Sequence, residues 1–131
     1  MHLSLTATNM GKTIWTVTAD DSGAWSYESR AVARAEGSLS EGDRAQLISL
    51  YEHVDWNREV LNHGITSDTM IRLHLDVTKA DGDKRTYTFN ADTNQLSDEL
   101  SDLVHFLRHN IMGAGEPVGR IPDDMRDQPR L

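Results

Sequence analysis

The sequence contains no cysteine, and this absence removes several kinds of chemistry at once. Without thiols, the chain can form no disulfide, no cysteine-ligated zinc site, no iron–sulfur cluster and no thiolate nucleophile. Long apolar runs are also missing, because no stretch approaches the roughly 20 residues that cross a bilayer. Residues 1–6 have neither the basic segment nor the apolar segment of a signal peptide. These absences predict a cytoplasmic protein.

Positive charge is scarce in the chain. It has 13 Lys and Arg residues against 21 Asp and Glu residues, which gives a formal net charge of -8. A surface of that sign repels phosphate backbones and anionic lipids, and no cluster of Lys or Arg provides a local exception. We therefore expect no nucleic acid and no membrane among its partners, and we expect the chain to bind another protein.

Motifs that would identify a reaction are missing too. The chain has no Gly-x-Ser-x-Gly nucleophile elbow. Gly113-Ala114-Gly115 follows a predicted helix, whereas a phosphate-binding loop precedes one. Asp76, Asp81 and Asp83 lack the glutamate and glycine spacing of an EF-hand loop, so turn chemistry explains them. The sequence predicts no catalytic residue and no cofactor, and the chain is not expected to be an enzyme.

Three strands are predicted in the first third of the chain, where apolar and polar residues alternate. The first strand begins near Leu3 and ends at the turn sequence Asn9-Met10-Gly11, and the second strand covers residues 13–18. The turn-forming residues 20–23 separate it from a third strand, residues 24–29. This arrangement predicts an antiparallel meander.

A helix and a hairpin are predicted next. Ser40 is suited to N-cap a helix over residues 40–54, and Asp43 stands where it can complete a capping box. Residues 71–77 alternate strictly between apolar and polar side chains, which predicts a strand with one wet face. Asp81-Gly82 predicts a two-residue turn before the return strand, residues 85–90.

An amphipathic helix is predicted over residues 97–111, followed by a segment in which Gly and Pro break any period. The apolar stripe of this helix consists of Leu100, Leu103, Val104, Leu107 and Ile111. We therefore predict a single α+β domain over residues 1–112, with a Gly/Pro-rich tail over residues 113–131. An antiparallel sheet of about five strands is packed by two helices in the order βββ-α-ββ-α.

His105 and His109 lie four residues apart on the last predicted helix, a spacing at which two imidazoles can share a metal ion, and Asp102 lies on the same side. The zincin motif places a catalytic glutamate after its first histidine, but Phe106 stands there. The simpler interpretation is a solvated helix face, so no metal site is predicted, and these three residues remain weak candidates.

The tryptophans suggest a binding surface. Trp15 and Trp25 lie on neighbouring predicted strands, and Trp56 follows the first predicted helix. Aromatic residues often anchor protein interfaces, although packing in the core is the competing explanation. Ile14 is expected on the face opposite Trp15, which would give the second strand apolar residues on both faces. The predicted surface comprises Ile14, Trp15, Trp25 and Trp56.

The order of elements resembles that of the emfourin-like family of small bacterial proteins. The resemblance rests on Gly37-Ser38-Leu39-Ser40 before the first helix, on Val54-Asp55-Trp56 after it, and on the hairpin of residues 71–89 before a final helix. It covers roughly residues 2–111 and implies a cytosolic protein that inhibits a thermolysin-like metalloprotease. The first turn, Thr8-Asn9-Met10-Gly11, departs from the family pattern, so no inhibitory residue is carried over.

The leading hypothesis is a small acidic protein-binding module, either a protease inhibitor or another regulatory partner in bacteria. It would act through a sheet face or a hairpin loop. A small enzyme or metal-dependent protein that uses His105 and His109 is one alternative. A self-associating structural protein, such as a homodimer, is another.

Overall fold

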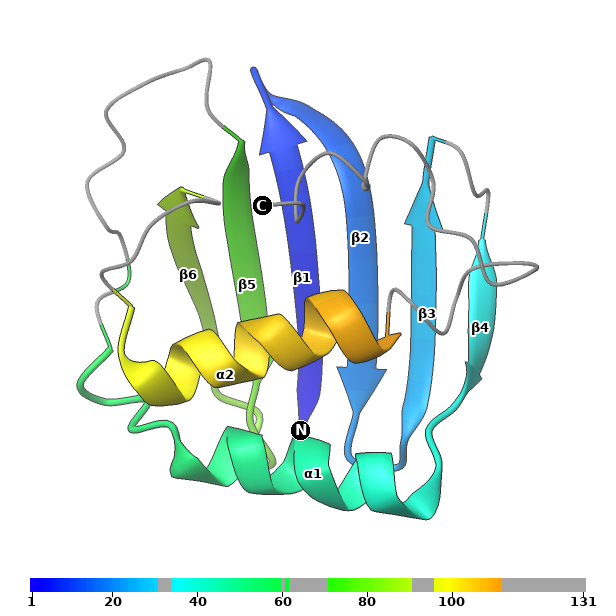
Figure 1. Ribbon diagram of the computed structural model, residues 1–131. Helices are drawn as coiled ribbons and strands as arrows, with labels where there is room; N and C mark the ends of the chain where they lie inside the picture. The colour runs from blue at the N-terminus through cyan, green and yellow to red at the C-terminus, as the bar shows by residue number, and fades with distance from the viewer. Residues whose placement is uncertain (31–33, 60, 62–70, 91–95, 112–131) are drawn as a thin grey trace.

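A computed structural model describes residues 1–30, 34–59, 61, 71–90 and 96–111 of the chain. Six antiparallel strands form one sheet in the order β4-β3-β2-β1-β5-β6 (Figure 1). The strands are β1 (His2–Asn9), β2 (Lys12–Asp20), β3 (Ala24–Ser29), β4 (Ala35–Ser38), β5 (Arg72–Thr78) and β6 (Lys84–Asn90). The predicted α+β class is confirmed, with six strands in place of about five.

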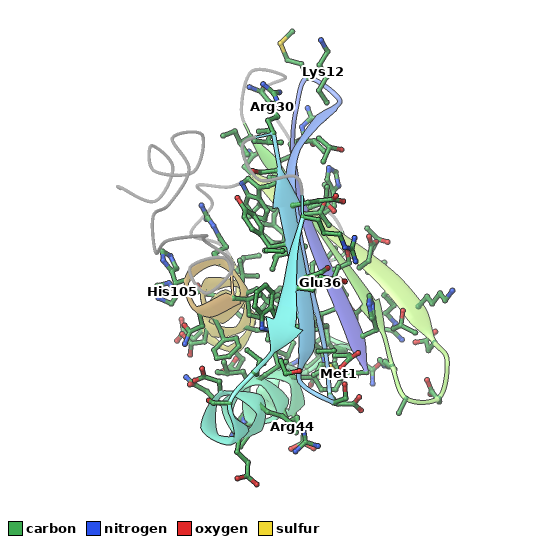
Figure 2. The ribbon with its side chains drawn as sticks, turned by 90° about the vertical axis from the view of Figure 1, so that its right-hand side faces the viewer. Met1, Lys12, Arg30, Glu36, Arg44 and His105 are labelled. Carbon is green, nitrogen blue, oxygen red and sulfur yellow. The ribbon has the colours of Figure 1, made fainter. Side chains whose placement is uncertain are left out.

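Two helices lie on the same side of the sheet, with α2 crossing its middle and α1 running along one end (Figures 1 and 2). Helix α1 spans Glu41–His53, and α2 spans Asp98–Phe106 and continues as a π-helical turn, η1 (Leu107–Ile111). The side chains of Ser40 and Ser97 accept hydrogen bonds from the first turns of α1 and α2, as N-caps do. No described helix is long and apolar enough to cross a membrane.

The core lies between the helices and the face of the sheet toward them. Alternate residues of β1 and β5 point to this face, so in these two strands the pattern of the sequence maps directly onto burial. From α2, Phe106 is buried together with the predicted stripe. The buried strand residues are Leu3, Leu5, Ala7, Ile14, Trp15, Val17, Ala19, Tyr27, Leu73, Leu75, Val77, Tyr87 and Phe89.

A bulge in β2 changes the expected position of Ile14. Ala7 pairs with Trp15, but Thr8 pairs with Thr13, so Ile14 is an extra residue without a partner in β1. A bulge interrupts the alternation of side chains, and the consecutive residues Ile14 and Trp15 are both buried. The alternation that placed Ile14 on the face opposite Trp15 does not hold at this bulge, and Ile14 is buried.

The β5–β6 connection differs from the predicted two-residue turn. The backbone N–H of Lys79 donates to the carbonyl of Asp83, so three residues, Ala80 to Gly82, form the loop. Gly82 has a φ of +90°, which suits the glycine position of a three-residue hairpin loop. The predicted tail, residues 113–131, lies outside the described residues.

Candidate binding surface at the β1–β2 hairpin tip

The turn between β1 and β2 presents an unusual residue to solvent. Met10 and Gly11 are the two central residues of this turn and have φ values of 53° and 79°. A type I′ hairpin turn requires positive φ at both positions, and Asn or Gly is the favoured residue at the first. Here a methionine occupies it, and its side chain is 75% exposed. We call residues 9–12 the hairpin tip.

Two cations lie at the same end of the sheet as the hairpin tip. Figure 2 shows Lys12 and Arg30 there, whereas Arg44 lies at the opposite end. The pairing of β3 with β2 ends at Trp15 and Ser29, so residues 12–14 extend beyond it. A groove of about 250 Å³ lies beside this extension, and its walls include Ile14, Glu28 and Arg30. The hairpin tip therefore combines an exposed apolar side chain with positive charge.

The opposite end of the sheet carries carboxylates and cations together. Asp20 and Asp81 each accept a hydrogen bond from the backbone two residues later, in the β2–β3 and β5–β6 turns. Burial raises the pKa of the Tyr51 hydroxyl, and the negative charges of Asp81 and Asp21 raise it further. A groove of about 520 Å³ adjoins Tyr51, but both Arg44 and acidic residues line it. Its mixed charges favour no single class of ligand.

The predicted tryptophan surface does not form in the described structure. Trp15 is 0% exposed and Trp56 is 7% exposed, and Ile14 is 8% exposed. Trp25 is partly exposed, but it packs against the core and lies over Gly37 of the neighbouring edge strand. These four residues therefore do not make a continuous surface, because three of them are buried and Trp25 packs against the core.

Trp56 has a structural role at the end of α1. Its indole Nε1 donates to the carbonyl of Tyr51 (3.2 Å), and its own carbonyl accepts from Tyr87 Oη (3.0 Å) and Arg85 Nη1 (2.9 Å). The Trp56 ring centroid lies 5.4 Å from those of both tyrosines. These contacts attach the end of α1 to β6, so they account for Trp56 without a binding role.

His105 of α2 and His109 of η1 lie close together, as their spacing in the sequence suggested. The ring centroids of His105 and His109 lie 4.1 Å apart, and both side chains are exposed. Burial, together with the charges of His105 and Arg108, lowers the pKa of His109. Asp102 is exposed on the same helix, but within the described part of the chain no group of three or more metal-ligating side chains is assembled. Of the three weak metal candidates, His105 and His109 are thus the two whose rings lie close together.

A third histidine bridges strands on the face of the sheet away from the helices. The hydroxyls of Thr8 and Thr88 lie 3.1 Å and 3.2 Å from the two ring nitrogens of His74. One nitrogen of a neutral imidazole donates and the other accepts, and a hydroxyl can satisfy either role. No carboxylate bonds to His74 among the described residues, so this arrangement lacks the orienting acid of a catalytic triad. It stabilises the pairing of β1, β5 and β6.

Sequence reasoning missed the residue that stands out most in the structure. The turn at Asn9-Met10-Gly11 was predicted, but Met10 was not singled out, although a methionine before glycine in a tight hairpin turn is itself unusual. Phe106 was considered only as a departure from the zincin motif, yet it is buried in the core. The periodicity of an ideal α-helix could not show the π-helical turn that follows it.

Comparison of the sequence with family models and with curated proteins finds no match. The emfourin-like resemblance therefore stays a prediction.

Proposed function

We propose that this chain is a protein-binding module that docks on its partner through the hairpin tip. The observation that carries the proposal is Met10, which is exposed and has a positive φ. Among the described residues, Leu61 is the other large hydrophobic side chain that is exposed. An unusual backbone conformation is a reason to look for function at that residue.

The backbone conformation of Met10 costs the free chain stability, and its exposed side chain contributes none. The left-handed conformation costs a residue with a Cβ roughly 1–2 kcal/mol. Exposure of the thioether also forgoes the hydrophobic free energy that burial would supply. Contact with a partner would recover the second contribution, since methionine is flexible and polarisable and adapts well to apolar pockets.

The charges near the tip indicate the kind of partner. Lys12 and Arg30 give this end of the sheet a positive character, although the whole chain has a net charge of -8. A pocket that accepts Met10 and carries carboxylates at its rim would complement the tip. The proposed partner is therefore a protein with an apolar, acid-rimmed pocket. If the partner is a protease, as the emfourin-like resemblance implies, the tip would occupy its cleft.

The test uses a photoreactive methionine analogue in place of the five methionines. Irradiation in a bacterial lysate should yield a stoichiometric adduct with one protein, and Met10→Asn should abolish it. Asparagine is compatible with the turn, so this variant removes the apolar anchor without disturbing β1 and β2. With the purified partner, Met10→Asn should weaken binding by about tenfold or more, because burying a methionine contributes about 1.5–3 kcal/mol.

Leu61→Asn is the matched control, since it removes the other large hydrophobic side chain that is exposed among the described residues, and it should leave the affinity unchanged. Equal affinity of the wild type and Met10→Asn for the captured protein would contradict the proposal. An inhibition assay against a captured protease would then decide whether binding also blocks activity.

A further inference from the structure

The structure describes two methionines, and they differ in accessibility. Met10 is 75% exposed at the hairpin tip, whereas the side chain of Met1 is 3% exposed and packs against the core. Met70, Met112 and Met125 lie outside the described residues. A peroxide oxidises a thioether only where it reaches the sulfur, so Met10 is far more susceptible than Met1.

The chain contains no thiol that would react in place of a methionine. It has five methionines and no cysteine. Cysteine and methionine are the side chains whose oxidation can be reversed by reductases. Among the described residues, Met10 is therefore the accessible position at which a reversible oxidation can occur.

The fold is compatible with an oxidised Met10. Asn9 and Lys12 are cross-strand partners on either side of the turn, and Met10 is not a member of the core. A sulfoxide oxygen on an exposed side chain keeps its contact with water, so it carries no desolvation cost. Oxidation within a core disrupts packing, but here it should change the surface and leave the sheet intact.

The position of Met10 also suits reduction of its sulfoxide by an enzyme. The pairing of β2 with β3 ends at Trp15 and Ser29, so the hairpin tip projects beyond this pairing. A reductase has to enclose the oxidised side chain in its own active site, and a projecting turn allows this more readily than a residue within a strand. Oxidant and reductase can therefore both reach Met10.

We propose that Met10 is a site of reversible oxidation that controls docking through the hairpin tip. The control of docking rests on the function proposed above, whereas the oxidation itself does not. A hydroperoxide would donate one oxygen atom to the thioether sulfur. The O–O bond breaks and an S=O bond forms, so the sulfur is oxidised and the peroxide is reduced to water or an alcohol. In the reverse direction a thiol-dependent reductase converts two thiols to a disulfide, and the oxygen leaves as water.

Oxidation would remove the property by which the proposed partner recognises Met10. It converts a flexible apolar side chain into a polar one, which an apolar pocket would have to desolvate. The affinity of the oxidised chain for its partner should therefore fall by about tenfold or more.

The modification site is tested on the free, full-length chain. Hydrogen peroxide is added, and mass spectrometry of proteolytic peptides follows each methionine. Met10 should be oxidised at least about tenfold faster than Met1, because its sulfur is accessible. Methionine sulfoxide reductases for both sulfoxide epimers, supplied with dithiothreitol, should restore Met10. Equal rates at the two residues, a sulfoxide that resists the reductases, or unfolding of the chain oxidised at Met10 would each overturn the assignment.

The control of docking is tested with the partner captured through the hairpin tip. Peroxide should weaken binding of the wild type, and the reductases should restore it. Met10→Leu is the matched control, because it keeps an apolar side chain without sulfur while the other four methionines remain, so peroxide should not change its affinity. Equal loss of affinity in Met10→Leu would overturn the control by Met10. Binding by the reduced chain that does not depend on Met10 would contradict the proposed function as well, but the oxidation rates of the free chain would still decide the modification site.

Discussion

Trp25 of β3 lies across Gly37, its cross-strand partner in the edge strand β4. A Cβ added to Gly37 would lie 2.6 Å from Cζ2 of the indole, which is closer than any real contact allows. Because aromatic rings commonly cover edge glycines in this way, the pair joins a four-residue strand to the rest of the sheet.

Gly37→Ala should therefore destabilise the protein. The methyl group forces the indole off its position, and overpacking of this kind costs roughly 1–3 kcal/mol. Urea unfolding measures the change. Gly42→Ala in α1 is the control, because its Cβ would meet nothing within 4 Å and alanine is the better helix former. A loss of stability in Gly42→Ala equal to that in Gly37→Ala would contradict the explanation.

Replacement of Met10 by asparagine should stabilise the protein. Met10→Asn relieves the left-handed strain at a φ of 53° and removes no core contact, so the free energy of unfolding should rise by up to about 1 kcal/mol. Thermal or urea unfolding of the free chain tests this. Met10→Val should lower stability, since a β-branched residue tolerates positive φ poorly. If Met10→Asn unfolds more easily than the wild type, Met10 must contribute to packing.

Lowering the pH should reduce the free energy of unfolding, because His109 becomes protonated more readily in the unfolded chain. Its pKa in the folded chain is lowered from the ordinary 6.5, so the unfolded chain binds more protons as the pH falls below that value. The contribution of this histidine is fully present above about pH 6.5 and is lost as the pH falls through the folded pKa. His109→Gln should reduce the slope of unfolding free energy against pH in this window. An unchanged slope would show that other groups cause it.

The hydroxyl of Tyr87 should contribute measurably to stability. It is buried and donates to the Trp56 carbonyl at 3.0 Å, so Tyr87→Phe removes a hydrogen bond and leaves that carbonyl with fewer partners. A loss of about 0.5–1.5 kcal/mol is expected in urea unfolding. Tyr51→Phe is the comparison, because among the described residues the Tyr51 hydroxyl has no hydrogen-bond partner. Similar losses in the two variants would rule out this explanation.

Most strands and both helix starts could be predicted because their signals are local. Leu73, Leu75 and Val77 alternate with polar residues, and the same residues are buried in β5. Ser40 and Ser97 precede helical periodicity, and both act as N-caps. Alternation and capping depend on neighbouring residues alone, so the sequence reports them without knowledge of the fold.

The features that were missed depend on distant contacts. Strand β4, Ala-Glu-Gly-Ser, has no alternation, and its extended form depends on pairing with β3. The bulge at Ile14 is defined by the register against β1. A tryptophan suits a core as well as an interface, so the sequence does not distinguish the two. The packing of the helices on the sheet determines which tryptophans are buried. A small cavity beside α2 is likewise lined by residues from β5, β6, α2 and η1.

The central position of β1 has a consequence for how the protein folds. Leu5 of β1 pairs with Val17 nearby in sequence, but on its other side it pairs with Leu75 of β5. The meander β1–β4 and the hairpin β5–β6 can each form locally. Pairing of β1 with β5 joins them, and it requires closure of the long segment between them. Until then β1 is an unprotected edge. Conditions that detach the hairpin would therefore expose the strand at which a hairpin from a second chain could dock.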